Sequence, residues 1–318
     1  MKLTIRQLRY VHEVALLGSV QAASRALNIS QSSILAAISV AEAEIGARLF
    51  DRKPARGVKL TPAGERYINA GHYLLEAEKE FDRTIGTLSS RVPPVLRIGC
   101  FEPLGAIFMA DFLRAYLDEI GGQIEVFLQE GDQLEVRNWL EQGRVDLAVL
   151  YDVGPEIPGS TTRICKVPAH ALLCADDPLG SKAALSLSEL ATRPLVLLDT
   201  PQTSTYLLAL FDVLAHRPVV KFRTRSYETV RAAVGAGLGI SVLNMRPMGR
   251  ATMDGPGIVR RPLLDDLPPP TLLVADMYGG MKPMFLRVFI DTMRAFFHRL
   301  GPAGFAVTTP DRQSQLLL

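Results

Sequence analysis

The decisive stretch of the chain is residues 19–33, which read SVQAASRALNISQSS. Ser19 and Ser30 are both good helix N-caps, because a serine hydroxyl accepts a hydrogen bond from an otherwise free N–H in the first turn. Asn28 tolerates the left-handed conformation in which many helices end. The stretch therefore predicts two helices joined by the three-residue turn 28–30, which is a helix-turn-helix.

The flanking residues complete a small winged domain. Apolar residues at helical spacing predict a first helix over residues 5–17, and the third helix runs from its Ser30 cap to about residue 45. Two short apolar runs, residues 49–50 and 58–60, can pair as strands around a basic tip. We therefore expect three helices and a hairpin in the first sixty residues.

The polar residues of this domain suit contacts to double-stranded DNA. The first turn of the second helix in a helix-turn-helix enters the major groove, where glutamine can pair with adenine and serine with any base edge. A basic hairpin tip suits the phosphate backbone or the minor groove. The candidate DNA contacts are Gln31, Ser32 and Ser33 in the helix and Arg52, Lys53 and Arg56 in the tip. The helix residues alone fit a solvated cap equally well, and the basic tip favours DNA.

The charge distribution points the same way. The net charge is only +2, but residues 1–66 hold ten Lys and Arg against five Asp and Glu, while the remaining residues hold 25 against 28. A basic head on a faintly acidic body is typical of nucleic-acid binders, because neutralising phosphates supplies most nonspecific affinity. By itself, this asymmetry leaves a chance fluctuation equally open.

A long helix is predicted after the winged head. Thr61 and Pro62 form a strong helix start, an N-cap followed by proline at the first position. Residues spaced alternately three and four apart then form a heptad seam, which is typical of a dimer interface. The seam comprises Tyr67, Ala70, Leu74, Ala77, Phe81, Thr84 and Leu88. We expect Tyr67, Leu74, Phe81 and Leu88 to carry dimerisation, the alternative being a helix that lies against its own domain.

The body alternates strands and helices. Apolar runs at residues 95–99, 124–128 and 146–150 are separated by helical patterns, and this alternation predicts a parallel sheet with crossover helices. A second unit contains further strand-like runs, and a last helix spans about residues 283–300. The sequence thus predicts an α/β chain with a head at 1–61, a linker at 62–90, a body at 91–300 and a flexible tail at 301–318.

Residues 4–65 resemble the LysR-type transcriptional regulators closely. The matching pieces, in order, are Leu8-Arg9-Tyr10, Gly18-Ser19-Val20, Ala22-Ala23, Leu27 to Ser33, Glu42, Leu49 to Arg52, Gly57, Leu60-Thr61 and Ala63-Gly64-Glu65. In the body, the run Gly143 to Ala148 resembles the effector domain of the same family. The resemblance implies a winged helix-turn-helix, a dimerising linker helix and a periplasmic-binding-protein-like effector domain. It also implies transcriptional control, in which a small molecule alters how the oligomer bends promoter DNA.

The resemblance also divides the body into two α/β subdomains with a ligand cleft between them. Subdomain I would comprise 91–161 and 268–300, and subdomain II 162–267. Ligands in open α/β sheets sit beyond the carboxyl ends of the strands. The candidate effector contacts at those ends are Cys100, Phe101, Glu102, Gln129, Glu130, Thr200, Gln202, Thr203 and Ser204. The stretch 200–204 precedes a helix whose free N–H groups could bind an anion, whereas Glu102, Glu130 and Asp152 argue mildly against a dianionic effector.

One departure from the family concerns the recognition helix. Family members often carry polar or basic residues where this chain has Leu35-Ala36-Ala37. Fewer base contacts are then available, so specificity would depend more on the helix start, the wing and DNA deformability.

The remaining features bound the function. Three cysteines without CxxC spacing suggest neither a disulfide framework nor a zinc site, and Cys100 is expected to be a packed or ligand-touching thiol, not a redox sensor. Without a long apolar run or a signal peptide, we expect a cytoplasmic protein with no membrane association. No catalytic motif or cofactor site is found, which disfavours an α/β enzyme, and a solute-binding protein would need export.

A constitutive DNA-binding protein with a vestigial cleft stays open. The expected partners are promoter DNA, a small-molecule effector and further copies of the chain, with RNA polymerase as another candidate. The heptads predict a homodimer, and the resemblance suggests a homotetramer.

Overall fold

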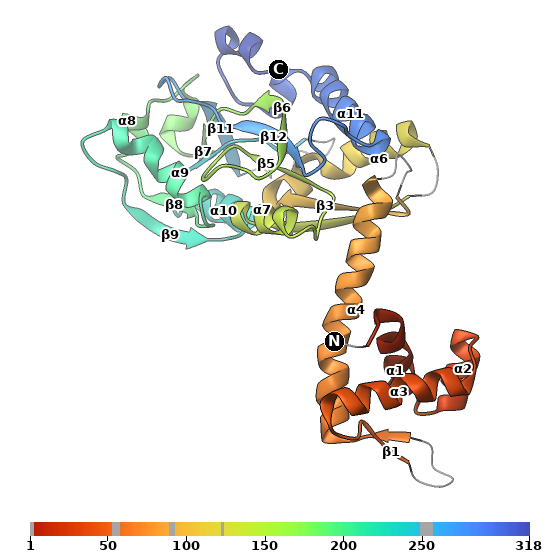
Figure 1. Ribbon diagram of the computed structural model, residues 1–318. Coiled ribbons are helices and arrows are strands. Elements are labelled where there is room, and N and C mark those ends of the chain that lie inside the picture. The colour runs from red at the N-terminus through yellow and green to blue at the C-terminus, as the bar shows by residue number, and fades with distance from the viewer. Residues whose placement is uncertain (1–2, 53–57, 89–92, 122–123, 249–256) are drawn as a thin grey trace. The chain divides into compact units, whose positions relative to one another are not determined.

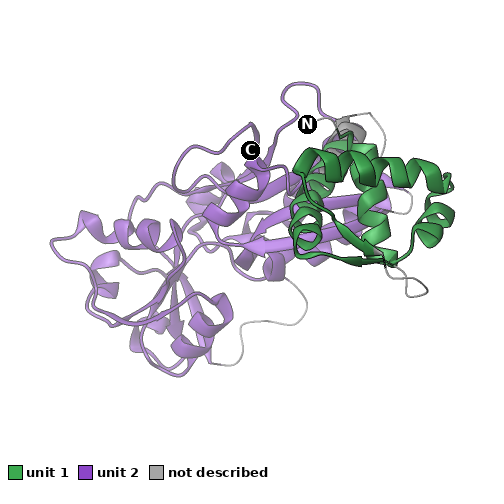
Figure 2. Cartoon of the chain, turned by 60° about the horizontal axis from the view of Figure 1, so that its bottom comes forward, with its two compact units in different colours: residues 1–86 green, residues 87–318 purple. Residues whose placement is uncertain are grey.

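The computed structural model describes residues 3–52, 58–88, 93–121, 124–248 and 257–318. The chain divides into two compact units, residues 1–86 and 87–318, which are coloured separately in Figure 2. Within the described residues, no helix is both long and apolar enough to cross a bilayer.

The first unit is the predicted winged head with its long helix (Figure 1). Its elements are α1 (Ile5–Leu17), α2 (Val20–Leu27), α3 (Gln31–Ile45), β1 (Phe50–Arg52), β2 (Val58–Leu60) and α4 (Pro62–Leu88). The caps agree with the sequence: the hydroxyls of Ser19 and Ser30 accept first-turn N–H groups, and Asn28 is left-handed, at φ 52°. Strands β1 and β2 pair antiparallel, so the hairpin is formed as predicted.

The core of the head lies between α1, α3 and the N-terminal half of α4. Val11 and Ile34 are fully buried in it, and Leu75 of α4 joins them at 7% exposure. The absence of a side chain at Gly71 lets α4 approach α1, because an added Cβ would lie 2.9 Å from Leu8 Cδ1. The base of the long helix is therefore part of the head's packing.

Subdomain I of the body is built on a five-stranded sheet with the strand order β4-β3-β5-β12-β6. The first three strands are parallel, and β12 pairs antiparallel with both of its neighbours. The strands are β3 (Val95–Phe101), β4 (Glu125–Gly131), β5 (Leu147–Tyr151), β6 (Ser160–Lys166) and β12 (Thr271–Asp276). The helices are α5 (Glu102–Leu104), the π-helical turn η1 (Gly105–Met109), α6 (Ala110–Ile120), α7 (Gln133–Glu141) and α11 (Met284–Leu300).

Helices α6 and α11 lie side by side (Figure 1). Aromatic side chains make the contact between them. The ring of Phe112 meets that of Phe289 edge to face at 4.8 Å, and Tyr116 does the same at 5.2 Å. All three rings are fully buried, so this aromatic cluster anchors the last long helix to the subdomain.

Subdomain II contains a three-stranded antiparallel sheet, β10-β7-β11, and the parallel pair β8-β9. A bridge between Leu195 and Ile240 links the two sheets. The strands are β7 (His170–Cys174), β8 (Leu195–Leu198), β9 (Val220–Thr224), β10 (Ser241–Leu243) and β11 (Ile258–Pro262). The helices are α8 (Leu187–Leu190), α9 (Thr203–Ala209) and α10 (Tyr227–Gly235), with 3-10 turns η2 (Pro178–Ser181) and η3 (Leu210–Val213).

The first crossing between subdomains lies later than predicted. Strand β6 pairs with β12 in the sheet of subdomain I, and β7 belongs to subdomain II, so the chain crosses at residues 167–169 and not near 162. The error arises because β6 has a polar, half-exposed first half, Ser160 to Arg163, which lacks an apolar run. The return falls between β11 and β12, at residues 263–270, which includes the expected position near 267.

The expectation of a flexible tail after residue 300 is wrong. This segment forms α12 (Pro302–Phe305) and the 3-10 helix η4 (Pro310–Gln315). Phe305 is fully buried and meets the ring of Phe297 at 5.2 Å, and Leu316 is 3% exposed. Apolar side chains at Phe305 and Leu316 anchor a segment whose polar composition suggested a mobile terminus.

Candidate DNA-binding surface and effector cavity

The start of α3 presents the polar residues that the sequence singled out. Gln31, Ser32 and Ser33 are all exposed, while Ile34 behind them is fully buried against α1. The helix is therefore held by its apolar face and offers its first turn to a partner. This is the arrangement that groove recognition requires.

The serine hydroxyls at this helix start form a small cluster around Ser30. The Ser30 hydroxyl accepts the Ser33 N–H at 3.2 Å and lies 2.9 Å from Ser32 Oγ and 2.8 Å from Ser33 Oγ. Because these hydroxyls bond among themselves, Gln31 is the residue of this turn with the longest unengaged polar side chain. We expect it to make the most discriminating base contact.

The departure from the family at residues 35–37 is smaller than the sequence suggested. Ala37 is fully buried in the head core, so it does not belong to the surface that would face DNA. Leu35 is half-buried and Ala36 exposed, and only these two positions replace polar groups on the outer face. Ile38 and Ala41 are buried, and Val40 is half-buried.

The hairpin is tied firmly to the recognition helix. The carboxylate of Glu42 on α3 accepts the Leu49 N–H at 2.8 Å, and Val58 N–H donates to the carbonyl of Gly18 at 2.9 Å. Lys59 on β2 is exposed. Lys53, Arg56 and the side chain of Arg52 lie outside the described residues, so their roles stay predictions from sequence.

The long helix α4 has two different faces. One face packs on α1, with Leu75 buried and Arg9 paired to Glu78 at 2.8 Å. The other exposes apolar side chains at Tyr73, Leu74 and Phe81, which are 77%, 39% and 65% exposed.

The predicted seam therefore falls largely on the open face. Leu74 and Phe81 lie there, but Tyr67, in the second turn of α4, is half-buried against the head core. At this position the helix lies on its own domain. The side chain of Leu88 lies outside the described residues.

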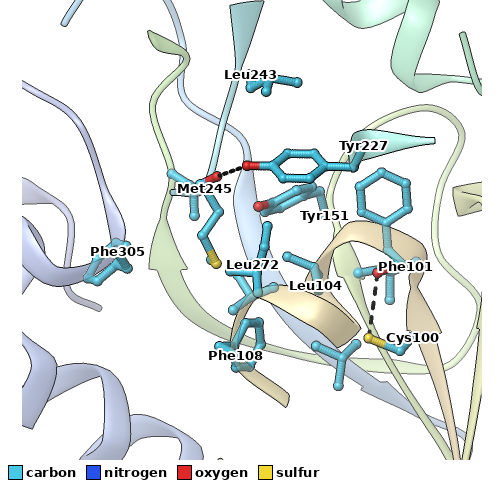
Figure 3. Packing of buried hydrophobic residues seen from close by; sticks show 14 of the residues in the cluster. Cys100, Phe101, Leu104, Phe108, Tyr151, Tyr227, Leu243, Met245, Leu272 and Phe305 are labelled. Carbon is cyan, nitrogen blue, oxygen red and sulfur yellow. Dashed lines mark hydrogen bonds between the residues drawn. The ribbon is translucent and has the colours of Figure 1, made fainter. Parts of the chain in front are cut away.

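A cavity lies between the two subdomains of the body, at the carboxyl ends of β3, β5, β8 and β10. Figure 3 shows part of its wall, with the rings of Phe101, Tyr151 and Tyr227 close together. Phe101 meets Tyr151 edge to face at 5.8 Å. The cavity is lined by Phe101, Pro103, Ile107, Gln133, Tyr151, Val153, Leu198, Thr203, Tyr206, Leu207, Tyr227, Leu243, Asn244 and Met245. This position agrees with the expected place for a ligand in open α/β sheets.

Two of the predicted cleft residues, Phe101 and Thr203, line this cavity. Cys100 does not, because its side chain is fully buried on the other side of the strand, where its thiol lies 3.6 Å from the carbonyl of Phe101 (Figure 3). Burial, with a smaller contribution from Glu130, raises the pKa of the Cys100 thiol well above its ordinary value. Cys100 is thus a packed thiol, the first of the two readings that the sequence left open.

The acidic candidates lie outside the cavity lining. Glu102 and Glu130 are exposed, and Gln129 is half-buried on the edge strand β4. The Glu130 carboxylate packs over Gly105, and burial together with the charge of Glu102 raises the pKa of Glu130. Asp152 accepts the Thr271 N–H at 2.6 Å, so it also serves the fold.

The stretch before α9 does not form an anion site. The N–H groups of Thr203 and Ser204 already donate to the carbonyls of Pro201 and Thr200, at 2.8 and 3.0 Å, so they are not free for a ligand. The hydroxyl of Ser204 bonds to the Thr200 carbonyl as well, and Thr200 is buried outside the cavity lining. Gln202, at φ 66°, instead packs its side chain against Gly154 of subdomain I.

Sequence reasoning missed several polar residues of the cavity wall, above all Tyr151, Tyr206, Tyr227 and Asn244. A signal existed for two of them, because Tyr151 directly follows the run 146–150 and Asn244 directly follows the apolar residues that end β10. An apolar run predicts a strand, and the residue that follows a strand in an open α/β sheet is a candidate cleft residue. Tyr206 and Tyr227 lie on helices, where no local pattern marks them.

Direct contacts hold the cleft together. Arg225 of subdomain II pairs with Asp132 of subdomain I at 3.0 Å, and Asp132 also caps α7. Inside, Asn244 Nδ2 donates to Tyr206 Oη and to the carbonyl of Val167 in the first crossing, both at 3.0 Å. The cavity wall is thereby bonded to one of the segments that join the subdomains.

Comparisons with known proteins agree with both sites. Residues 5–65 match the bacterial regulatory helix-turn-helix domain of the LysR family, and residues 90–297 match the LysR substrate binding domain. A putative LysR family regulator, PA01 protein of Pseudomonas aeruginosa, is 31% identical, with a TM-score of 0.58 over 95% of this chain and 100% of that one. HinK, a LysR family regulator from the same organism, is 30% identical, with a TM-score of 0.58 over 92% and 98%.

A curated relative is more distant. YvbU of Bacillus subtilis, an uncharacterised HTH-type transcriptional regulator, is 25% identical over 77% of this chain and 83% of its own length. Since the two family domains together cover most of the sequence, the chain belongs to the LysR family of bacterial transcriptional regulators. It is a DNA-binding, ligand-responsive regulator with an N-terminal helix-turn-helix and a C-terminal substrate-binding domain.

Proposed function

We propose that the chain reads promoter DNA through the first turn of α3 and reports the state of the body cleft to that surface. The observation that supports this most is the start of α3, where three exposed polar residues precede a buried apolar face. Gln31 would carry base discrimination, while Lys59 and the basic tip, Arg52, Lys53 and Arg56, would contact phosphates. Because its target is the chromosome, the regulator would act in the cytoplasm, with RNA polymerase as a further partner.

We also propose that the chain acts as a homo-oligomer built on α4. The open face of this helix exposes Tyr73, Leu74 and Phe81, and large apolar side chains in a row are costly to leave in water. A second copy of the helix would cover them. Two heads would then read two half-sites, which compensates for the small DNA surface that one head can bury.

The cavity between the subdomains is the proposed effector site. Ligand binding there would change how the subdomains sit against each other, since its wall includes residues from both and Asn244 bonds to the first crossing. The competing function is that of a constitutive DNA-binding protein with a vestigial cleft. No observation on the described residues favours it.

Selection of genomic fragments by the purified chain tests the proposed function. We expect a shared motif with two related half-sites for the parent, loss of that motif for Gln31→Ala, and its retention for the control Gln21→Ala, an exposed glutamine on α2. Recovery of fragments without a common motif by the parent would contradict sequence-specific regulation. Loss of the motif in both variants would contradict the role assigned to Gln31.

A further inference from the structure

The cavity wall carries hydroxyl groups that the protein itself does not satisfy. Tyr151 and Thr203 are 5% and 7% exposed, and neither hydroxyl has a hydrogen-bond partner among the described residues. Buried polar groups are nearly always hydrogen-bonded, so an unpartnered one at a cavity points to an occupant. Each hydroxyl can both donate and accept. The occupant would therefore be a hydrogen-bonding molecule.

The hydroxyl of Tyr206 is a third group of the cavity wall that can bond to a ligand. Tyr206 Oη accepts a hydrogen bond from Asn244 Nδ2 at 3.0 Å, and no described residue accepts the proton of this phenol. Burial is the main cause that raises the pKa of Tyr206 to about 12, and Asp152 adds to it. The phenol is thus neutral, and its proton is available to a bonding partner in the cavity.

The electrostatics of the wall disfavour a charged ligand. Among the described lining residues there is no Lys, Arg, His, Asp or Glu. The guanidinium of Arg225 across the cleft is already paired with Asp132, and the exposed carboxylate of Asp152 acts on Tyr206. The guanidinium of Arg260 reaches the wall at Tyr227 Oη, at 3.4 Å, and also bonds to His170 Nε2. A carboxylate or phosphate would leave water for a lining that contains no cationic side chain, which is unfavourable.

The volume of the cavity also limits the size of the ligand. Its free volume is about 30 Å³. A single water needs roughly 10–15 Å³ on the same measure, so the space accommodates an occupant of about two to four non-hydrogen atoms before the subdomains must move. A larger ligand requires the cleft to open.

We propose that this cavity binds a small uncharged molecule that both donates and accepts hydrogen bonds, such as a primary amide or an alcohol, and excludes carboxylates. The proposal rests on the proposed function, in which the cleft is the effector site. Tyr151, Thr203 and Tyr206 provide the hydrogen bonds, and Asn244 carries the change at Tyr206 to the crossing at Val167. A ligand of four atoms binds with a Kd no tighter than about 0.05 mM, so the assay must work at millimolar concentration.

Acetamide and acetate provide a matched test, because they share size and shape and differ in charge. The melting temperature of the full chain is measured with each, at equal ionic strength, for the parent, for Tyr151→Phe with Thr203→Val, and for the control Thr161→Val, an exposed threonine on β6 outside the cavity lining. We expect acetamide to raise the melting temperature of the parent and the control by a few degrees and to leave the double variant unchanged. Acetate should have no effect on any of them.

Three outcomes would overturn the proposal: an equal rise with acetate, the same rise with acetamide in the double variant, or no rise with either molecule. Binding of a promoter fragment is measured on the same samples. Intact DNA binding with any of these outcomes would overturn the ligand class alone, whereas a parent chain that fails to bind DNA would contradict the proposed function.

A second, independent observation concerns the C-terminal segment 302–317, which lies beyond the end of the matched family domain at residue 297. Arg312 donates to the carbonyls of Leu264 and Asp265, both at 3.0 Å, at the start of the return crossing. The carbonyl of Leu316 accepts the Lys166 N–H at 2.8 Å, immediately before the first crossing. The segment therefore touches both connections between the subdomains.

The same segment also bonds to Arg246, three residues after β10 ends. The N–H of Arg246 donates to the Phe305 carbonyl at 3.0 Å, and its guanidinium bonds to the Ala303 carbonyl at 3.3 Å. Phe305 is anchored in the core of subdomain I against Phe297. We infer that segment 302–317 is a brace that restricts the opening of the cleft, because opening must bend the two crossings that it fastens.

Distance measurements between spin labels test the brace. Labels are placed at two exposed positions, Glu141→Cys in subdomain I and Lys221→Cys in subdomain II, with Cys174→Ser as background. We expect a narrow distance distribution for this background and a broader or longer one for Arg312→Ala and for a chain ending at Thr309. An unchanged distribution in Arg312→Ala would overturn the inference even if the shortened chain failed to fold.

Discussion

The head and the cleft differ in how their functional residues are arranged along the chain. In the head, the candidate base contacts occupy consecutive positions, 31–33, at a helix start fixed by its own cap. The cavity draws its wall from residues between 101 and 245, contributed by strand ends and helices of both subdomains. The candidate DNA contacts of the head can therefore be predicted from local sequence signals. The residues of the cleft wall come together only when the body has folded.

The two regions also differ in chemistry. The DNA-binding surface is open, polar and basic, so its contacts are made to an outside partner and depend on salt. The cavity lies between the subdomains and has no charged side chain in its lining, which consists of aromatic rings, aliphatic side chains and a few polar groups. We expect single substitutions in the head to act one contact at a time, and those in the cleft to act through the relation between the subdomains.

The largest expected effect concerns the open face of α4, on which the pairing of two heads depends. Leu74→Lys with Phe81→Lys should give a monomer and lower the affinity for DNA with two half-sites by about 10²- to 10⁴-fold, because the second head no longer binds intramolecularly. Light scattering and DNA titration measure this. Glu76→Gln with Asp82→Asn is the control, since it changes the charge equally on exposed positions away from these two side chains. An unchanged mass for the lysine variant would contradict the seam.

The next prediction tests whether the head unfolds independently of the body. Ile34→Ala removes a fully buried side chain and should lower the stability of the head by about 2–5 kcal/mol. Ile45→Ala is the matched control, because this residue lies on the same helix at 41% exposure. Calorimetry should show an earlier transition for the head alone and an unchanged transition for the body. A shift of both transitions would show that the two units unfold together.

A smaller effect is expected from pH in the body. His170 is fully buried, and its Nε2 lies 2.7 Å from the Arg260 guanidinium, so the ring is held neutral as an acceptor. Burial, then the charge of Arg260, lowers the pKa of His170 well below its ordinary value. Its contribution to stability is therefore complete above pH 6.5 and is lost as the pH falls below 6.5, where the unfolded chain takes up a proton and the folded chain does not.

The variant His170→Gln isolates this contribution. The stability difference between the parent and the variant should be constant above pH 7 and should shrink by about 1.4 kcal/mol for each pH unit below 6.5. Denaturant titrations at several pH values measure it. A difference that stays constant down to pH 5 would show that His170 is protonated in the folded body.

The sequence predicted the parts of the molecule that local chemistry determines. Serine caps, the left-handed Asn28 and apolar periodicity placed the helices of the head and most strands of the body. It misplaced what depends on distant partners: β6 is a strand because β12 pairs with it, and the last residues are ordered because Phe305 and Leu316 find buried sites.

The same reasoning explains the cleft. Phe101 and Thr203 were found because they follow strand ends, but Cys100, one residue from Phe101, points to the opposite side of the same strand. Tyr206 and Tyr227 come from helices whose inward faces only the folded body defines. Side chains next to each other in sequence thus divide between core and cavity, and no local pattern distinguishes them.

The most direct test of the account compares the binding free energy of Gln31→Ala and Arg56→Ala on the selected motif and on a shuffled sequence, at several salt concentrations. The account predicts that Gln31→Ala loses about 1–3 kcal/mol on the motif and almost nothing on the shuffled DNA. Arg56→Ala should lose affinity equally on both and flatten the salt dependence. Equal losses for Gln31→Ala on both sequences would contradict base recognition by the start of α3.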